Sequence, residues 1–148
     1  MSIKNKRDFI ILIEDDPVQA MFFGRMIKKI AEELGLKSKT MTSGTEFLEF
    51  ILGIKVLPDL HKDQVGLIIL DLQLPNDEIS GFYILKEVQK LKYKIPIIVQ
   101  SADSKHTSII KAMKLGAKDY FLKDGQKEEG ERIFDTIEEI MGKTAHLG

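Results

Sequence analysis

The stretch VGLIILDLQLPND, residues 65–77, decides the fold of this chain. Five of the six residues before Asp71 are apolar, which is the pattern of a strand buried on both faces of a parallel sheet. The run then ends abruptly on a carboxylate. An unpaired ionised carboxylate at the edge of an apolar core is costly, so we expect a compensating group elsewhere in the chain.

The composition favours a single domain with no affinity for polyanions. The chain has 148 residues, and its 22 basic and 23 acidic side chains leave a formal charge of −1. There is no overall basic field to collect nucleic acid or an anionic membrane. Cysteine is absent, and the polar opening MSIKNKRD resembles neither a signal peptide nor a membrane span. We expect a soluble, cytoplasmic protein that binds neither nucleic acid nor membranes directly.

Apolar runs alternate with segments of helical periodicity along the chain. The predicted strands cover residues 9–13, 37–42, 65–70, 95–100 and 118–122. The predicted helices cover residues 17–35, the segment from Ser43 to near Gly53, residues 81–91, the segment from Ser104 to Gly116, and residues 128–142. This alternation predicts an α/β fold with one parallel sheet and helices on both of its faces.

Capping residues mark three of the predicted helix starts. Asp16 precedes Pro17 and is a candidate N-cap, Ser43 is followed three residues later by Glu46, and Ser104 stands before the fourth helix. The first helix also carries apolar residues at helical spacing. These are Val18, Phe22, Met26, Ile30 and Leu34.

The residues at the carboxyl ends of the strands are the candidates for ligand binding or reaction, because ligands of such sheets bind beyond these ends. These ends carry Glu14, Asp15 and Asp16, then Asp71, Ser101 and Lys123. Converging carboxylates repel one another, and a hard divalent cation such as Mg²⁺ relieves the repulsion. A carboxylate can also act as the nucleophile in phosphoryl transfer. An ammonium and a hydroxyl can then bind phosphoryl oxygens.

Four motifs together give the chain a family resemblance. They are EDD after the first strand, LDLQLP around Asp71, QSAD after the fourth strand and GAKDYFLKDG across the fifth. In this order and at these strand ends, the chain resembles a receiver domain of the two-component response regulators. The resemblance runs from Phe9 to about Met141, so we expect residues 1–148 to form one receiver domain. It implies a flavodoxin-like, doubly wound sheet of order 2-1-3-4-5 with five helices.

The resemblance also implies roles for individual residues. Asp71 would be the phospho-acceptor. Asp15 would be the main Mg²⁺ ligand, assisted by Glu14 and by the backbone carbonyl of Gln73. Ser101 and Lys123 would bind the phosphoryl group, and Tyr120 with Ser101 would form the switch.

The implied activity is that of a signalling switch and not of a classical enzyme. Its phosphoryl donor would be a histidine kinase or a phosphotransfer protein, and slow self-dephosphorylation would reset it. A downstream protein would read the change on the face made by the fourth helix, fifth strand and fifth helix. The chain would be a monomer or a weak dimer.

Two departures from the family pattern stand out. Asp71 to Gly81 spans ten positions, so the loop beside the site is longer than usual. Lys123 is followed by Asp124 in place of the usual proline. Because a cis bond before a non-proline residue is costly, we expect a trans Lys123–Asp124 peptide, a positive φ at Gly125 and a mobile loop over residues 123–128. The sequence ends one helix later, as in a receiver that acts alone or one cut from a longer protein.

Other interpretations stay open. Asp71 could be a simple turn former, and Tyr120 could serve packing alone. A haloacid-dehalogenase-type phosphatase would need a second Asp at the position of Gln73, and a flavin-binding module would need a phosphate-binding loop where EDDPVQ stands. A phosphorylation-independent interaction module is a further alternative. The three histidines, which are His61, His106 and His146, lack ligand spacing and are expected at the surface.

Overall fold

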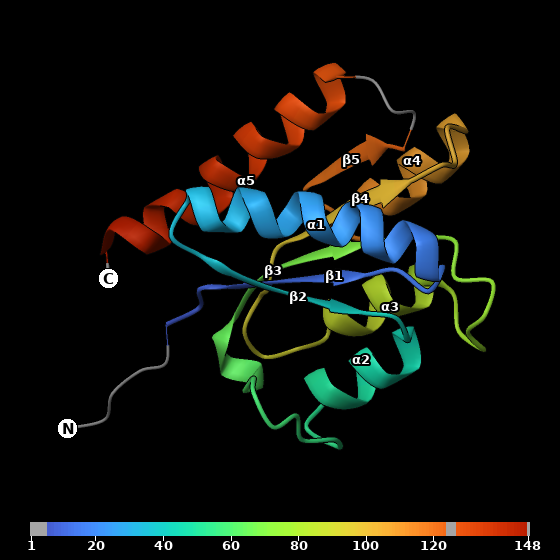
Figure 1. Cartoon of the computed structure of the whole chain (residues 1–148). Coiled ribbons are helices and arrows are strands. Elements are labelled where there is room, and N and C mark those ends of the chain that lie inside the picture. The colour runs from blue at the N-terminus through green and yellow to red at the C-terminus, as the bar shows by residue number, and fades with distance from the viewer. Residues whose placement is uncertain (1–5, 124–126, 148) are drawn as a thin grey trace.

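The computed structural model describes residues 6–123 and 127–147, which form a five-stranded parallel sheet with helices on both faces (Figure 1). The strands are β1 (Phe9–Ile13), β2 (Lys37–Met41), β3 (Val65–Leu70), β4 (Ile97–Ser101) and β5 (Asp119–Leu122). Their order is β2-β1-β3-β4-β5, and every neighbouring pair is parallel. The predicted flavodoxin-like order is therefore confirmed.

The helices divide between the two faces of the sheet. They are α1 (Pro17–Glu33), α2 (Gly44–Ile51), α3 (Gly81–Val88), α4 (His106–Lys114) and α5 (Lys127–Leu147), with a short 3₁₀ helix, η1 (Lys62–Gln64), before β3. Side chains alternate along each strand, so Leu67 and Ile69 pack with α1 and α5, and Ile68 and Leu70 pack with α2, α3 and α4. Each residue of β3 is buried, which explains its continuous apolar run.

The structure revises the apolar pattern of α1. The buried residues of this helix are Ala20, Ile27, Ile30 and Ala31. Val18 and Phe22, which begin the predicted stripe, are 75% and 67% exposed. The predicted stripe has a strict four-residue spacing, which drifts around a helix of 3.6 residues per turn and carries Val18 and Phe22 away from the face that holds Ile27.

The helix starts agree with two of the three predicted caps. Asp16 accepts hydrogen bonds from the amides of Val18 and Gln19 (2.9 and 3.0 Å), and Ser43 accepts one from Glu46 (3.1 Å). The prediction for Ser104 is wrong. The N-cap of α4 is Lys105, without a side-chain bond, because the Asp103 carboxylate takes the amide of Lys105 (3.0 Å).

Arg132 joins α5 to β5. One guanidinium nitrogen bonds both carboxylate oxygens of Asp119 (3.1 Å each), and the other donates to the Tyr120 carbonyl oxygen (2.8 Å). The guanidinium also lies 4.0 Å from the centre of the Phe121 ring. The start of α5 is therefore attached to three consecutive residues of the strand.

Two further predictions concern segments outside these elements. The Lys123–Asp124 peptide and Gly125 lie outside the described residues. In the described ranges, no helix combines the length and apolar character that crossing a bilayer requires.

Candidate functional site

Asp71 lies at the carboxyl end of β3. Its amide donates to the Ile13 carbonyl oxygen (3.2 Å), so pairing with β1 continues one residue past the strand. The residue is only 5% exposed. Gly81 begins α3 beside it, and a Cβ at Gly81 would collide with the backbone of Asp71 and Leu72. The loop from Asp71 to Gly81 therefore closes tightly on the end of the strand.

Lys123, which follows β5, is the compensating group for Asp71. Its ammonium donates to Asp71 Oδ2 (2.6 Å), to Glu14 Oε1 and to Gln19 Oε1 (2.7 Å), and its side chain is 5% exposed. The Lys123 amide donates to the Ser101 carbonyl oxygen (2.9 Å). The backbone beside β4 therefore holds the ammonium between two buried carboxylates.

Glu14 is a buried partner of Lys123 with a raised pKa. Burial, followed by repulsion from Asp71, raises the pKa of Glu14 from 4.5 to about 7. The hydrogen bond from Lys123 opposes this shift without cancelling it. Glu14 therefore exchanges a proton in the neutral pH range.

Asp15 is held by the lengthened loop. Asn76 donates from its amide to Asp15 Oδ2 (2.7 Å) and from its side chain to the Asp15 carbonyl oxygen (3.2 Å). The residue is 4% exposed, and its Oδ1 atom is buried without a hydrogen-bond partner. Burial raises the pKa of Asp15, and the carboxylates of Asp77 and Asp71 raise it further.

Ser101 and Tyr120 meet at the loop between β4 and α4. Ser101 is fully buried, and its hydroxyl accepts a hydrogen bond from the Asp103 amide (3.2 Å). The Tyr120 hydroxyl donates to the Asp103 carbonyl oxygen (2.6 Å), and burial raises the pKa of this phenol. The Asp103 side chain also accepts from the Ser108 hydroxyl (2.5 Å). Both predicted switch residues thus contact one loop residue that leads into α4.

The donor set around Asp15 fits a hard divalent cation. Within residues 6–123 and 127–147, no three His, Cys, Asp or Glu side chains form a ready metal cage. Mg²⁺ needs only one or two carboxylates with several waters, and the buried, unpartnered Oδ1 of Asp15 is such a donor. The Gln73 amide donates to Asp71 Oδ1 (3.0 Å), so its peptide lies beside the same carboxylate. The role of the Gln73 carbonyl stays a prediction.

Four residues of the site were missed from the sequence. They are Gln19, Asn76, Asp77 and Asp103. Gln19 sits in the first turn of a helix, and the other three sit in polar loops where Asn and Asp ordinarily form turns. Only the unusual length of the segment from Asp71 to Gly81 singled out the loop that holds Asn76 and Asp77.

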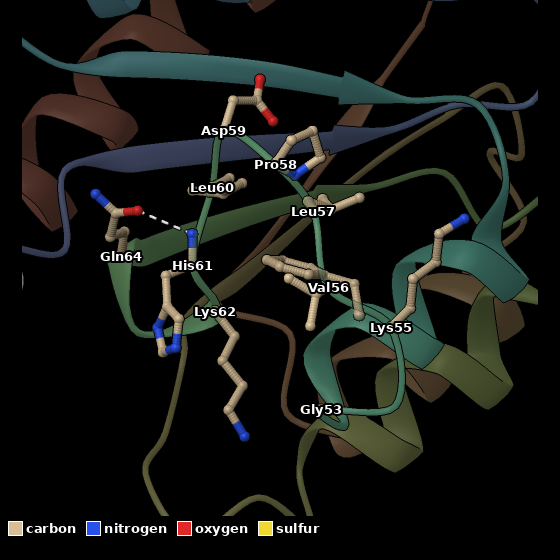
Figure 2. Close-up of a pocket in the computed structure, with 11 residues that line it drawn as sticks. Gly53, Lys55, Val56, Leu57, Pro58, Asp59, Leu60, His61, Lys62 and Gln64 are labelled. Carbon is tan, nitrogen blue, oxygen red and sulfur yellow. Dashed lines mark hydrogen bonds between the residues drawn. The ribbon is translucent and has the colours of Figure 1, made fainter.

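A separate cavity of about 440 Å³ lies at the opposite edge of the sheet, before β3 begins (Figure 2). Its lining residues are Phe50, Gly53, residues 55–62 and Gln64. None of the predicted site residues lies there. His61 is exposed at its rim and accepts a hydrogen bond from the Asp63 amide (3.2 Å). The candidate site therefore lies at the carboxyl ends of the strands, around Asp71, and not in this cavity.

Comparisons with known proteins give relatives among response regulators and chemotaxis proteins. A curated relative, the chemotaxis protein CheV1 of Helicobacter pylori, is 32% identical over 120 residues, which cover 80% of this chain and 35% of the relative. The two-component response regulator ARR8 of Arabidopsis thaliana is 27% identical over 136 residues, which cover 83% of this chain and 58% of the relative. The chain thus spans only part of the length of either protein.

Solved structures share the fold. The crystal structure of the Mn²⁺-bound form of response regulator Rcp1 matches with a TM-score of 0.70 at 19% identity, over 88% of this chain and 91% of that one. The phosphorylated cyanobacterial phytochrome response regulator RcpA matches with a TM-score of 0.69 at 23% identity, over 89% of this chain and 91% of that one.

The sequence match to a family model extends over the elements that build the site. The model of the response regulator receiver domain matches residues 10–135, from the start of β1 into α5. That range includes each of the predicted site residues. This chain therefore belongs to the response regulator receiver domain family.

Proposed function

We propose that Asp71 accepts a phosphoryl group from a histidine kinase or phosphotransfer protein, and that partner proteins read the change. The observation that most directly supports this role is the Asp71 carboxylate, buried at the strand end and 2.6 Å from the Lys123 ammonium. The carboxylate is a nucleophile, and the ammonium is a charge partner for phosphoryl oxygens. On this proposal the chain is a signalling domain that is modified at Asp71.

In the transfer step, a carboxylate oxygen of Asp71 forms a bond to phosphorus. The P–N bond of a phosphohistidine breaks at the same time. The imidazole nitrogen keeps the electron pair of that bond and takes up a proton from solvent. Lys123 moves its ammonium from the Asp71 carboxylate to a phosphoryl oxygen, and Ser101 donates its hydroxyl to another. In the separate dephosphorylation step, water attacks phosphorus, the bond between phosphorus and the Asp71 oxygen breaks, and inorganic phosphate leaves while the carboxylate is restored.

Mg²⁺ supplies charge neutralisation for the phosphoryl oxygens when it is bound. Asp15 and Asp71 hold it, assisted by Glu14 and the Gln73 carbonyl. Asp15 is supported by its buried Oδ1 atom, which has no hydrogen-bond partner. The hydrogen bonds from Asn76 orient the Asp15 side chain before the cation arrives.

The change is read through Asp103 and α4. When Ser101 turns its hydroxyl toward the phosphoryl group, its contact with the Asp103 amide changes. Tyr120 is bound to the same residue and follows. The readout face is then α4, β5 and α5, where a downstream protein binds.

The test uses two small phosphoryl donors, each with MgCl₂. They are acetyl phosphate, which has a P–O bond to break, and phosphoramidate, which has a P–N bond. Intact-protein mass spectrometry should show one added phosphoryl group that hydroxylamine removes, as expected for an acyl phosphate. Asp71→Asn should take up none. Glu78→Gln, a neutralised exposed carboxylate on the neighbouring loop, is the matched control and should behave as wild type.

Two results would contradict the proposal. One is phosphorylation of Asp71→Asn at the wild-type rate, which would move the acceptor elsewhere. The other is a folded wild-type protein that binds Mg²⁺ and takes up no phosphoryl group, which would favour a phosphorylation-independent interaction module.

The readout is tested with beryllofluoride, a phosphoryl mimic that needs no partner protein. Amide NMR signals of Asp103, α4 and Tyr120 should shift when it binds. Shifts confined to the loops around Asp71 would show that the change does not reach the proposed face.

A further inference from the structure

The loop between β3 and α3 brings an additional carboxylate to the site. Asn76 binds Asp15 through its amide and its side chain, which fixes the middle of the loop above the end of β1. The next residue is Asp77. The loop also lines an open cavity of about 590 Å³, and Asp77 is one of its lining residues.

One oxygen of Asp77 is anchored and the other is not. Asp77 Oδ1 accepts a hydrogen bond from the Thr45 amide in the first turn of α2 (3.1 Å), and the Ser43 hydroxyl lies 3.5 Å away. Asp77 Oδ2 is buried without a hydrogen-bond partner, like Oδ1 of Asp15. The Asp77 carboxylate raises the pKa of Asp15, which agrees with the position of Asp77 next to Asn76, the residue that binds Asp15. Neighbouring carboxylates repel one another unless a proton or a cation lies between them.

The surrounding packing fixes Asp77 in this place. Gly44 begins α2 next to it, and a Cβ at Gly44 would lie 3.6 Å from Asp77 Cγ and 2.7 Å from Ile84 Cδ1. The positive end of the α2 dipole also favours a carboxylate at the Thr45 amide. Asp77 is therefore held toward Asp15 by contacts that do not depend on a cation.

We propose that Asp77 supplies a further carboxylate oxygen, its unpartnered Oδ2, to the divalent cation site at Asp15. This inference rests on the proposed function, because it assumes that Asp15 binds the cation. With Asp15 and Asp71, Asp77 makes three carboxylates, one more than Mg²⁺ ordinarily takes in proteins, so the site carries more negative charge than usual. The lengthened loop thereby raises the affinity of the site and connects it to the first turn of α2.

The affinity test compares Asp77→Asn with Glu78→Gln. Each change removes one negative charge from the same loop, but the Glu78 side chain is exposed. Asparagine retains an oxygen for the Thr45 amide, so the loop keeps its anchor on α2. Titration with MgCl₂ and, separately, with MnCl₂ should give a dissociation constant about tenfold higher for Asp77→Asn and within twofold of wild type for Glu78→Gln.

The location test follows the Thr45 amide by NMR during the MgCl₂ titration. In the wild type its signal should shift with the same dissociation constant as the site. In Asp77→Asn the shift should be smaller at saturation. Thermal unfolding in EDTA checks that each variant is folded, and Asp77→Ala provides a second variant that lacks the oxygen altogether.

The outcomes separate this inference from the proposed function. Equal affinities of wild type and Asp77→Asn, or equal losses in Asp77→Asn and Glu78→Gln, overturn the role of Asp77. If Asp15→Asn abolishes binding in that case, the proposed cation site stands without Asp77. If Asp15→Asn binds Mg²⁺ as tightly as wild type, the proposed cation site itself is wrong.

Discussion

The Lys123 ammonium lies 2.6 Å from Asp71 Oδ2, and their side chains are 5% and 7% exposed. A buried ion pair of this kind contributes little net stability compared with an apolar pair, but removal of one partner is costly. Lys123 also bonds Glu14, so its loss would leave two buried carboxylates close together. Stability and phosphoryl chemistry therefore depend on the same ammonium.

Lys123→Met should lower the free energy of unfolding by about 3 kcal/mol at pH 8, because Glu14 and Asp71 lose their counterion. At pH 5 the loss should be smaller, since Glu14 is then protonated. Urea unfolding at both pH values measures the difference. Lys118→Met removes the same charge from an exposed position and should change stability little. Equal stability of Lys123→Met and Lys118→Met at pH 8 would contradict this account.

The metal-free protein should become less stable as the pH rises from about 5 to 8. The pKa of Glu14 is raised from 4.5 to about 7 by burial, so the folded state binds a proton that the unfolded state releases. The contribution of Glu14 to the free energy of unfolding is therefore fully present below the pKa that Glu14 has in the unfolded chain. It is lost as the pH rises through the pKa of Glu14 in the folded protein. The raised pKa of Asp15 acts in the same direction.

Urea unfolding in EDTA across this range measures the effect. The free energy of unfolding should change less between pH 5 and pH 8 in Glu14→Gln than in wild type. We expect this difference to be about 1–2 kcal/mol after solvent screening is allowed for. A wild-type profile that rises with pH in parallel with Glu14→Gln would be inconsistent with this assignment.

Gly81→Ala should destabilise the protein by about 2 kcal/mol, because the new methyl group must displace the backbone behind Asp71. It should also slow phosphorylation by acetyl phosphate. Gly130→Ala is the matched control, since Gly130 lies inside α5 and a Cβ there would meet no atom of the described residues within 4 Å beyond the adjoining helix backbone. There alanine should stabilise by about 0.5–1 kcal/mol. Thermal or urea unfolding of the two variants should give shifts of opposite sign.

Tyr120→Phe should cost about 1 kcal/mol by removing the bond to the Asp103 carbonyl oxygen. It should also reduce the beryllofluoride-induced NMR shifts in α4 while leaving those at Asp71. Tyr93→Phe removes another tyrosine hydroxyl, bound to Asp63 (3.3 Å), and should leave the α4 shifts unchanged. If Tyr120→Phe preserves the full α4 response, Tyr120 serves packing alone.

The sequence predicts the fold well because the buried strands carry a strong signal. The run before Asp71 is apolar throughout except for Gly66, and only a strand covered on both faces requires that. The parallel topology then brings Glu14, Asp71 and Lys123 to one edge, so their proximity follows from strand order. The predicted strands differ from the observed ones by at most two residues at either end.

The missed features depend on contacts between loops and helix ends, which have no periodicity. Asp77 is an ordinary turn residue by sequence, and only the folded loop places it beside Asp15. Asp103 replaces Ser104 at the start of α4 because its carboxylate reaches both the Lys105 amide and the Ser108 hydroxyl. Phe22 fits a helical stripe of strict four-residue spacing, yet this spacing drifts around the helix and leaves Phe22 67% exposed.

The attachment of Arg132 to β5 should make α5 less free to move than α4. Arg132 contacts Asp119, Tyr120 and Phe121, so α5 cannot shift without breaking several bonds at once. By contrast, the start of α4 is bound through Asp103, whose carboxylate accepts from the Lys105 amide and the Ser108 hydroxyl and whose backbone contacts Ser101 and Tyr120. Phosphorylation should therefore alter amide hydrogen exchange in α4 and leave the first turns of α5 unchanged, and an equal response in both helices would contradict this. A partner that binds mainly to α4 should therefore respond to the state of Asp71 more strongly than a partner that binds mainly to α5.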